Sequence, residues 1–446
     1  MKVLHVITGL GVGGAEQQLR LLVRELRQAD VESEVVTLTN PGAVADALEA
    51  DGVPVTHLGM SGNRDLSAVP RLASVIRAGG YDVVHTHLYR ACVYGRVAAR
   101  LAGVRTVVAT EHSLGATQME GRPLGLGTRA LYRATERLGS GTLAVSETVA
   151  RRLGAWGVSE DRVHLAPNGI HPAEFRFSQV ARLAVRARLG IPAHAYVVGG
   201  VGRQVTGKNF DALIESVVAL SREQPTDGQQ LAGPIHLVLA GDGPERVPLL
   251  RLVQELGAAA RVHMAGPPDG GTDGSPAVGE LLSAMDLFVS TSAEESFGLA
   301  LLEALACGLP ALYVSCPAVE DLPPEDAPGA RLIKLPDLTA VLREEWSAGP
   351  RRLPVPAAVE RYHISRTAEQ VLALYEAAIA RNAPRRKGDS ETASASVPGP
   401  ATAEPLLGQA PAEERIPAAP GLSDDAHLAD AQPADVHAAD VQPAEK

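Results

Sequence analysis

Short apolar runs alternate with longer amphipathic segments along most of this chain. In the block from Met1 to Phe175 the runs lie at 2–8, 33–38, 54–58, 82–87, 106–111 and 141–146. In a second block, from about Ala181 to Pro354, they lie at 196–202, 235–241, 261–266, 287–291 and 310–314. Apolar strands separated by helical segments are typical of parallel sheets covered on both faces. The pattern predicts an α/β protein with two doubly wound, Rossmann-like domains.

The domain boundaries follow from the same pattern. We expect an N-terminal domain at 1–178, a C-terminal domain at 179–358 and a helix at 359–382 that packs back across the domains. Residues 383–446 are rich in Ala, Pro, Asp and Glu, which predicts a disordered tail. Ligands of doubly wound sheets bind outside the carboxyl ends of the strands, so two facing domains predict a central cleft. Gly- and Pro-rich loops are expected at 223–234 and 267–276.

Composition excludes several classes of protein. The formal net charge is -11, which does not suit nucleic-acid binding. The 3 cysteines lack the C-x-x-C spacing of a zinc site and indicate a reducing compartment. The longest apolar stretch, 297–314, contains Glu303 and Pro310 and makes a poor membrane span. We therefore expect a cytoplasmic protein.

The segment HVITGLGVGGAEQ, residues 5–17, resembles a dinucleotide-binding loop. Such a site needs an acid at the end of the second strand, but that strand ends in TLTN, with Glu34 at its beginning. A nicotinamide or flavin site is therefore not favoured. Glycines before a helix still let backbone N–H groups approach an anionic ligand. A tight turn without a ligand is the alternative.

Two cations follow the first strand of the second block. In GVGRQVTGKNF, Arg203 and Lys208 stand between a strand and a helix. Arginine offers a bidentate fork and lysine a mobile point charge, so the pair suits a diphosphate. Two solvated surface charges are the alternative interpretation.

The segment EESFGLALLEALACGLP carries two acids, Glu295 and Glu303. Eight residues of helix span about 12 Å, beyond the roughly 5–9.5 Å between the acid and base of glycoside hydrolases. The two carboxylates therefore suit different parts of one elongated ligand. The alternative for Glu295 is an acid favoured by the helix dipole. Glu303 lies among leucines and alanines, where a buried carboxylate needs a specific partner.

These motifs together resemble the retaining, nucleotide-sugar-dependent glycosyltransferases of the GT-B fold, glycosyltransferase family 4, also called glycosyltransferase group 1. The resemblance covers about Met1–Arg381. It rests on the E-x7-E pattern, GR-x4-KN, AGDGPE (240–245), PNGI (167–170) and GGAE (13–16).

The resemblance implies roles for individual residues. Glu303 would bind the donor ribose, while Glu295 would lie by the transferred sugar. Candidate donor-binding residues are Gly13, Gly14, Arg203, Lys208, Phe297, Gly298, Leu299 and Glu303. His112, in ATEHSLG, matches the active-site histidine of the family, so His112 and Glu295 are the candidate catalytic residues. A structural histidine is the alternative for His112.

His85 and His87, in VVHTHLYR, are weaker candidates, one of which would line the acceptor pocket. The pair is not a metal site on its spacing, because no third ligand follows in the sequence. We expect no cofactor and no essential metal, because cations and helix N-termini can stabilise a departing diphosphate. By resemblance, transfer retains the anomeric configuration. Two departures limit the comparison: His171 replaces the usual acid after PNGI, and 311–333 lacks the usual glycine-rich turn.

The predicted function is transfer of a sugar from a nucleoside-diphosphate sugar to an acceptor hydroxyl, in cell-envelope polysaccharide, glycolipid or glycosylated-metabolite synthesis. The alternatives are a nucleotide-sugar epimerase or hydrolase on the same fold and a non-catalytic nucleotide-sugar-binding protein. The acceptor is expected to be a glycan, glycolipid or small molecule. Arg129, Arg133 and Arg137 follow one helix face, so they suit peripheral contact with the inner face of the membrane. A solvated helix face is the alternative.

Overall fold

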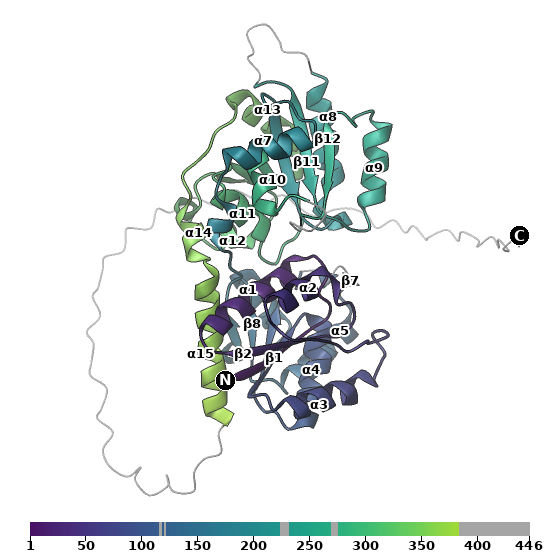
Figure 1. Ribbon diagram of the computed structural model, residues 1–446, viewed down its shortest axis with the longest axis vertical. Helices are drawn as coiled ribbons and strands as arrows, with labels where there is room; N and C mark the ends of the chain where they lie inside the picture. The colour runs from purple at the N-terminus through teal and green to yellow at the C-terminus, as the bar shows by residue number, and fades with distance from the viewer. Residues whose placement is uncertain (116–117, 120–121, 224–231, 269–274, 383–446) are drawn as a thin grey trace, which may run out of the picture. The chain divides into compact units, whose positions relative to one another are not determined.

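The computed structural model describes residues 1–115, 118–119, 122–223, 232–268 and 275–382 (Figure 1). The predicted tail at 383–446 and the central parts of the two predicted loops lie outside these residues. The described part carries two parallel sheets, which confirms the predicted fold class. In spatial order, the first sheet consists of β3 (Val55–His57), β2 (Glu32–Thr37), β1 (Lys2–Ile7), β4 (Val83–His87), β5 (Val107–Glu111), β8 (Gly141–Ala144) and β9 (Val163–Leu165).

The second sheet has a corresponding strand order. It consists of β12 (Val262–Gly266), β11 (Ile235–Ala240), β10 (Tyr196–Val201), β13 (Leu287–Ser290), β14 (Ala311–Tyr313) and β15 (Ala330–Leu332). In each sheet the chain first adds strands on one side and then crosses to the other. The order therefore reverses between β1 and β4 in the first sheet, and between β10 and β13 in the second. These topological switch points are where doubly wound sheets bind ligands.

Helices follow most of the strands. Those of the first half are α1 (Gly14–Gln28), α2 (Gly42–Ala50), α3 (Ala68–Gly79), α4 (Tyr89–Ala102), α5 (Leu126–Glu136) and α6 (Glu147–Ala155). Those of the second half are α7 (Gln179–Arg188), α8 (Phe210–Ser221), α9 (Arg246–Glu255), α10 (Val278–Ala284), α11 (Leu299–Ala306), α12 (Pro317–Glu320) and α13 (Leu338–Ala348). The last helices are α14 (Ala357–Arg361) and α15 (Ile364–Asn382).

Strand β1 shows why the apolar runs form central strands. Leu4 and Val6 pack with residues of α3 and α4, whereas Val3 packs with residues of α1 and α15. Alternate side chains of one strand thus enter cores on opposite faces of the sheet. Both faces are covered, so an uninterrupted apolar run is needed.

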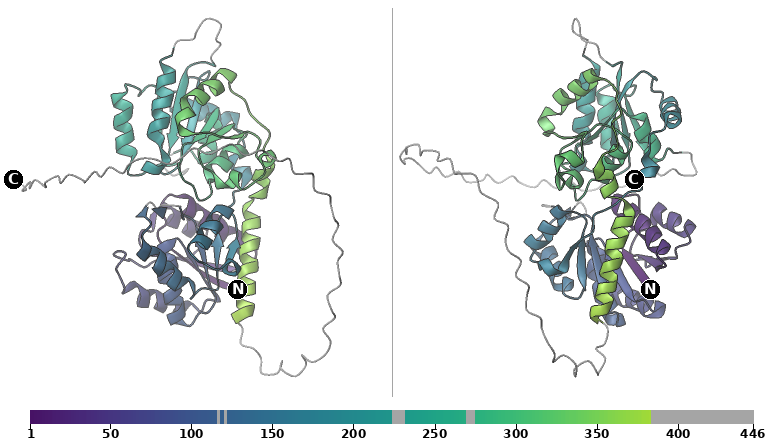
Figure 2. Two further views of the ribbon diagram at one scale, coloured as in Figure 1. Left: turned by 180° about the vertical axis from the view of Figure 1, so that it is seen from behind. Right: turned by 90° about the vertical axis from the view of Figure 1, so that its left-hand side faces the viewer.

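Helix α15 packs on the first sheet, along which it runs in Figure 2. Val371, Leu374 and Tyr375 share a buried cluster with Val3 and Leu22. The domain boundaries expected from the sequence, and the bridging role expected for 359–382, stay predictions.

The PNGI segment explains how the beginning of α15 is held. Ile170 N donates to Tyr362 O at 2.9 Å, and Ile364 N donates to Ile170 O at 3.0 Å. A Cβ on Gly169 would lie 2.6 Å from Cα of Ile364, so only glycine fits there. Part of this motif therefore serves the packing of the last helix.

Three features were not predicted. The short strands β9 and β15 each have three residues and contain partly exposed side chains. A two-residue antiparallel pair, β6 (Gln118–Met119) with β7 (Arg122–Pro123), also has no clear apolar pattern. Strand prediction from apolar runs misses such short edge elements because they bury too few side chains to leave a pattern.

Candidate active site

The predicted site residues lie at the two topological switch points. In the second sheet, Arg203 and Lys208 follow β10, and Glu295 lies in the loop between β13 and α11. In the first sheet, Gly13 and Gly14 lie between β1 and α1, and His112 directly follows β5. These residues were chosen from the sequence because they follow predicted strands. The strand order brings each set together at the carboxyl ends of the strands of its sheet.

Lys208 and Glu295 form an ion pair, in which Lys208 Nζ contacts Glu295 Oε1. Two hydrogen bonds to backbone carbonyls hold the two loops together: Thr291 Oγ1 donates to Lys208 O at 2.6 Å, and Ala293 N donates to Gly207 O at 3.1 Å. The lysine predicted for the diphosphate and the acid predicted for the sugar are therefore direct neighbours. Arg203 is exposed, and its guanidinium makes no hydrogen bond or ion pair with the described residues.

The beginning of α11 lies beside this pair in the sequence. Gly298 is the N-cap residue and has φ 106, a conformation that favours glycine. A Cβ at this position would lie 2.3 Å from Sγ of Cys316. The ring of Phe297 is buried and meets Tyr362 edge-on at 5.1 Å. Phe297 therefore has only its backbone to offer a ligand, while the first N–H groups of α11 have no partners within the helix.

Glu303 lies one turn further along α11 and is partly buried. Burial first, and the neighbouring charge of Glu174 second, raise the pKa of Glu303 to about 7. Within the described residues the carboxyl group of Glu303 has no hydrogen-bond partner. The specific partner expected from its sequence context is thus not supplied by the described part of the chain.

The glycine loop at the first switch point lies close to α11. Gly13 is the N-cap of α1 and Gly14 its first residue, and a Cβ on Gly14 would lie 3.4 Å from Cδ1 of Leu299.

The acid that a dinucleotide site requires is not at the carboxyl end of β2. Glu34 instead binds Lys2 and Tyr81 near the beginning of its strand.

His112 is linked to a buried histidine. His112 Nε2 lies 3.2 Å from His87 Nδ1, within hydrogen-bond distance. Burial lowers the pKa of His112 to about 4, while the side chain of Asn168 favours its charged form. At neutral pH the imidazole of His112 is therefore uncharged.

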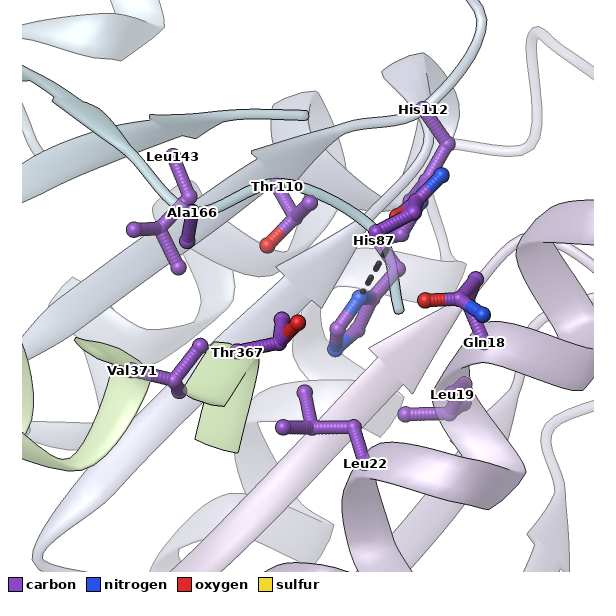
Figure 3. Close-up of a pocket in the computed structure, with 11 residues that line it drawn as sticks. Gln18, Leu19, Leu22, His87, Thr110, His112, Leu143, Ala166, Thr367 and Val371 are labelled. Carbon is purple, nitrogen blue, oxygen red and sulfur yellow. Dashed lines mark hydrogen bonds between the residues drawn. The ribbon is translucent and has the colours of Figure 1, made fainter. Parts of the chain in front are cut away.

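A small cavity lies beside His112 and His87 (Figure 3). The space open to the centre of a water molecule is about 20 Å³, room for about one water. The lining also includes Thr110, Gln18 and Asn168. Sequence reasoning did not single out Gln18 or Asn168, although Asn168 belongs to the PNGI motif, which could have indicated it.

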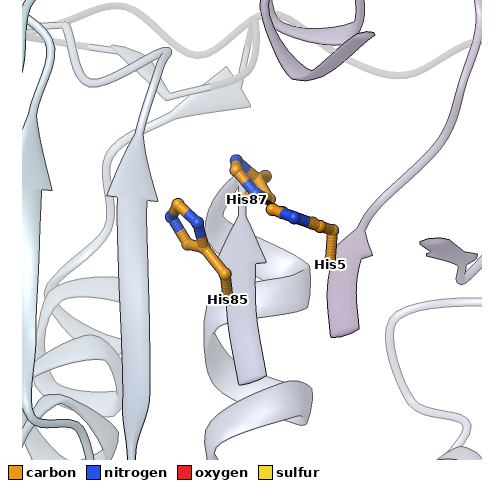
Figure 4. A group of neighbouring side chains, drawn as sticks. All are labelled: His5, His85 and His87. Carbon is orange, nitrogen blue, oxygen red and sulfur yellow. Dashed lines mark hydrogen bonds between the residues drawn. The ribbon is translucent and has the colours of Figure 1, made fainter. Parts of the chain in front are cut away.

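Three buried histidines come together under the first switch point (Figure 4). His5 of β1 joins His85 and His87 of β4, with ligand atoms within 4.8 Å of one another. The sequence prediction held that no third ligand accompanies the H-x-H pair. That reason was wrong, because β1 and β4 are neighbours and His5 pairs in register with His85.

The metal-binding capacity of this group is limited by its hydrogen bonds. His85 Nδ1 lies 2.5 Å from the Tyr375 hydroxyl, and His85 Nε2 lies 2.7 Å from Thr110 Oγ1. Both nitrogens of His87 are also engaged, with His5 and His112. Metal ligation by all three side chains would need these bonds to break.

The three arginines of the predicted membrane-facing stripe are exposed on α5 and at its C-cap. Leu126 and Leu131 of α5 are exposed as well. Among the described helices, none combines the length and apolar composition needed to cross a bilayer. Peripheral membrane contact stays a prediction.

Comparison with known proteins identifies the class. The model for Glycosyltransferase Family 4 matches residues 12–174, and the model for Glycosyl transferases group 1 matches residues 182–327. A D-inositol 3-phosphate glycosyltransferase from Salinispora arenicola is 30% identical over 326 residues, covering 67% of this chain and 71% of the relative. The putative glycosyltransferase EpsF from Bacillus subtilis is 29% identical, covering 70% of this chain and 78% of the relative.

Solved structures agree with this class. HepE from Anabaena, solved with UDP and glucose, has a TM-score of 0.68 at 21% identity, covering 84% of this chain and 100% of HepE. Sucrose-phosphate synthase from Thermosynechococcus elongatus has a TM-score of 0.62 at 20% identity, covering 85% of this chain and 97% of that one. Together with the two sheets, these likenesses define a GT-B fold. The chain belongs to glycosyltransferase family 4 and is a glycosyltransferase.

Proposed function

We propose that this glycosyltransferase moves a sugar from a nucleoside-diphosphate sugar to an acceptor hydroxyl with retention of anomeric configuration. The observation that carries the proposal is the Lys208–Glu295 ion pair at the switch point of the second sheet, next to the beginning of α11. A lysine, the exposed Arg203 and a helix N-terminus together suit a diphosphate. Glu303, on the same helix, suits the hydroxyls of the ribose.

The chemistry follows from where charge develops. The bond between the anomeric carbon and the diphosphate oxygen breaks, and a bond from that carbon to the acceptor oxygen forms. Negative charge grows on the leaving diphosphate, where Lys208, Arg203 and the α11 N-terminus stabilise it. The acceptor hydroxyl gives its proton to the leaving phosphate oxygen on the same face of the sugar, which retains the configuration. No cofactor or metal takes part in this scheme.

The pairing of Glu295 argues that the acceptor hydroxyl, and not a side chain of the protein, attacks the sugar carbon. Its carboxylate is already paired with Lys208, which lowers its reactivity toward a sugar carbon. The pair suits orientation of the sugar hydroxyls by Glu295 while Lys208 contacts the phosphate. His112, uncharged at neutral pH, lies at the other sheet edge and suits contact with the sugar.

The comparisons suggest which substrates to try first. HepE was solved with UDP and with UDP-glucose, and several relatives are named D-inositol 3-phosphate glycosyltransferases. UDP therefore comes first among the nucleotides, and D-inositol 3-phosphate first among the acceptors. Envelope glycans, glycolipids and hydroxylated metabolites complete the acceptor panel.

The first experiment is a thermal-shift panel of UDP, GDP, ADP, dTDP and NAD on the full chain. Ligand at 100 times its dissociation constant stabilises the folded state by about 2.7 kcal/mol, enough to raise Tm by a few degrees. One nucleoside diphosphate should raise Tm, and NAD should not. A shift with NAD alone would contradict the proposal.

The second experiment follows sugar release and transfer with that donor. Lys208→Met should remove most transfer, whereas Lys334→Met should not, because Lys334 is an exposed lysine outside the site. Product formation that needs no acceptor alcohol would favour the hydrolase or epimerase alternative. Nucleotide binding without any turnover would favour a binding protein, and full activity of the Lys208 variant would refute the site assignment.

A further inference from the structure

Four histidines lie at neighbouring positions near the carboxyl ends of three adjacent strands of the first sheet. His5 stands on β1, His85 and His87 on β4, and His112 directly after β5. His5 pairs with His85, and His87 pairs with Thr110 of β5. His5, His85 and His87 are fully buried, so each of their ring nitrogens needs a partner within the protein.

Three of these imidazoles form a continuous chain of hydrogen bonds. His112 Nε2 lies 3.2 Å from His87 Nδ1, the bond drawn in Figure 3. On its other side, His87 Nε2 lies 3.2 Å from His5 Nδ1. The chain therefore runs from the candidate site residue His112 through His87 to His5 in the core.

His85 stands apart from this hydrogen-bond chain, although the centroid of its ring lies 4.0 Å from that of His87, with the two rings tilted by 37°. Its two nitrogens are taken by Tyr375 and Thr110. His85 therefore has no free nitrogen with which to join the other three. It provides a buried histidine of the same strand for comparison.

A count of the ring protons leaves two arrangements for the hydrogen-bond chain of His112, His87 and His5. Burial lowers the pKa values of His5 and His112 to about 3 and about 4, so each is neutral and carries one N–H. The two N–H···N bonds must then point the same way along the chain. Either every proton lies on Nδ1 and the N–H at the end of the series is His112 Nδ1–H, or every proton lies on Nε2 and the end N–H is His5 Nε2–H.

The two ends of the chain have different surroundings. His5 Nε2 is buried and has no hydrogen-bond partner among the described residues. An N–H left there would be an orphaned donor, which is costly and rarer in proteins than an unfilled acceptor. His112 Nδ1 also makes no hydrogen bond of ordinary geometry, but Asn168 is near and the small cavity adjoins the ring. A donor is more easily satisfied at the His112 end.

We propose that His87 and His5 act as positioning residues that hold His112 in the tautomer protonated on Nδ1, so that His112 offers a hydrogen-bond donor toward Asn168 and the adjoining small cavity. His5 Nδ1–H donates to His87 Nε2, and His87 Nδ1–H donates to His112 Nε2. The proposal deepens the proposed function and rests on it for the ligand. A bond from His112 Nδ1–H toward Asn168 would fix the orientation of the His112 ring beside the transferred sugar.

The test is ¹⁵N NMR of the ring nitrogens in the ligand-free full chain labelled at histidine. Each signal is assigned by the loss it shows in His5→Gln, His87→Asn, His85→Gln or His112→Gln. We expect His5, His87 and His112 all to carry the proton on Nδ1, against the usual preference of imidazole for Nε2. A proton on Nε2 of His112, or a charged ring at neutral pH, overturns the proposal.

Two variants separate positioning from mere packing. His87→Leu removes the donor to His112, and the signal of His112 should move from protonated to unprotonated Nδ1. His85→Leu removes a buried histidine of the same strand but leaves the chain intact, so His112 should keep its tautomer. Equal tautomer changes in both variants would contradict the proposal, as would stoichiometric Zn²⁺ binding that shifts His5, His85 and His87 together. Because the tautomers are measured without a ligand, the proposal can fail independently of nucleotide binding.

Discussion

Glu303 should make nucleotide binding depend on pH, and Glu303→Gln should remove that dependence. The pKa of Glu303 is raised to about 7 by burial and by Glu174. A carboxylate accepts hydroxyl hydrogen bonds more strongly than a neutral acid does. The ribose of a bound nucleoside diphosphate should therefore bind better above pH 7 than below it.

The size of the effect follows from the ionised fraction. If only the carboxylate binds, affinity at pH 5.5 is weaker than at pH 8.5 by up to about 30-fold for a pKa near 7. The diphosphate titrates as well, with a last pKa near 6 by analogy with phosphate monoesters. Glu303→Gln keeps the shape of the side chain and removes its ionisation, so the ratio between wild type and variant isolates the part due to Glu303.

The same shift has a consequence for stability, with a definite sign. The folded-state pKa lies above the unfolded value, so the folded chain holds the extra proton between about pH 4.5 and 7. Stability falls as pH rises through this window, by up to roughly 3 kcal/mol. Denaturant unfolding of the wild type, compared with Glu303→Gln at each pH, measures the difference.

Isothermal titration calorimetry with the nucleotide identified by thermal shift gives the affinities at pH 5.5, 7 and 8.5. Glu174→Gln is the matched control. Removing the neighbouring charge should lower the midpoint of the pH dependence without abolishing it. Identical pH profiles for wild type and Glu303→Gln would refute both the raised pKa and the ribose contact.

Two further predictions concern the second sheet and its loops. Asp286→Ala should cost about 3–5 kcal/mol in denaturant unfolding, because Asp286 pairs with Arg182 at 2.6 Å and Arg186 at 2.7 Å and its loss leaves buried guanidinium charges. Glu344→Ala, which breaks an exposed pair, should cost no more than about 1 kcal/mol in the same assay. Gly298→Ala should cost about 2–5 kcal/mol through its φ of 106 and its clash with Cys316, and unchanged unfolding would show that the turn at α11 can relax.

Much of the fold could be predicted because the central strands are buried on both faces. The run KVLHVI became β1 and YVVGGV became β10, since each must place apolar residues in two cores at once. The short strands β9 and β15 were missed because they are only partly buried and carry His164 and Arg331. These segments are extended because they pair with a neighbouring strand of the sheet, and the local sequence pattern does not reveal that pairing.

The candidate site could be predicted only as positions along the chain. Residues that follow strands reach the same sheet edge, so Lys208 and Glu295 could be chosen without knowing that they pair. The influence of Glu174 on Glu303 depends on a contact between a 3-10 helix and α11, which spacing does not reveal. His5 was not connected with His87 because 82 positions separate them and only the β1–β4 pairing joins them.

The charges at the two sheet edges favour one orientation of a nucleotide-sugar donor. At neutral pH His5 and His112 carry no charge, because burial lowers their pKa values to about 3 and about 4. At the second sheet, Arg203 is exposed and Lys208 shares its charge with a single carboxylate. If the proposed donor binds here, its diphosphate gains more from these cations than from neutral imidazoles, so the proposal places the uncharged sugar and acceptor toward the first sheet. A positive charge at the first sheet should then attract the diphosphate as well and weaken the preference for one orientation of the donor. A histidine held neutral by burial therefore suits the position of His112 better than a lysine.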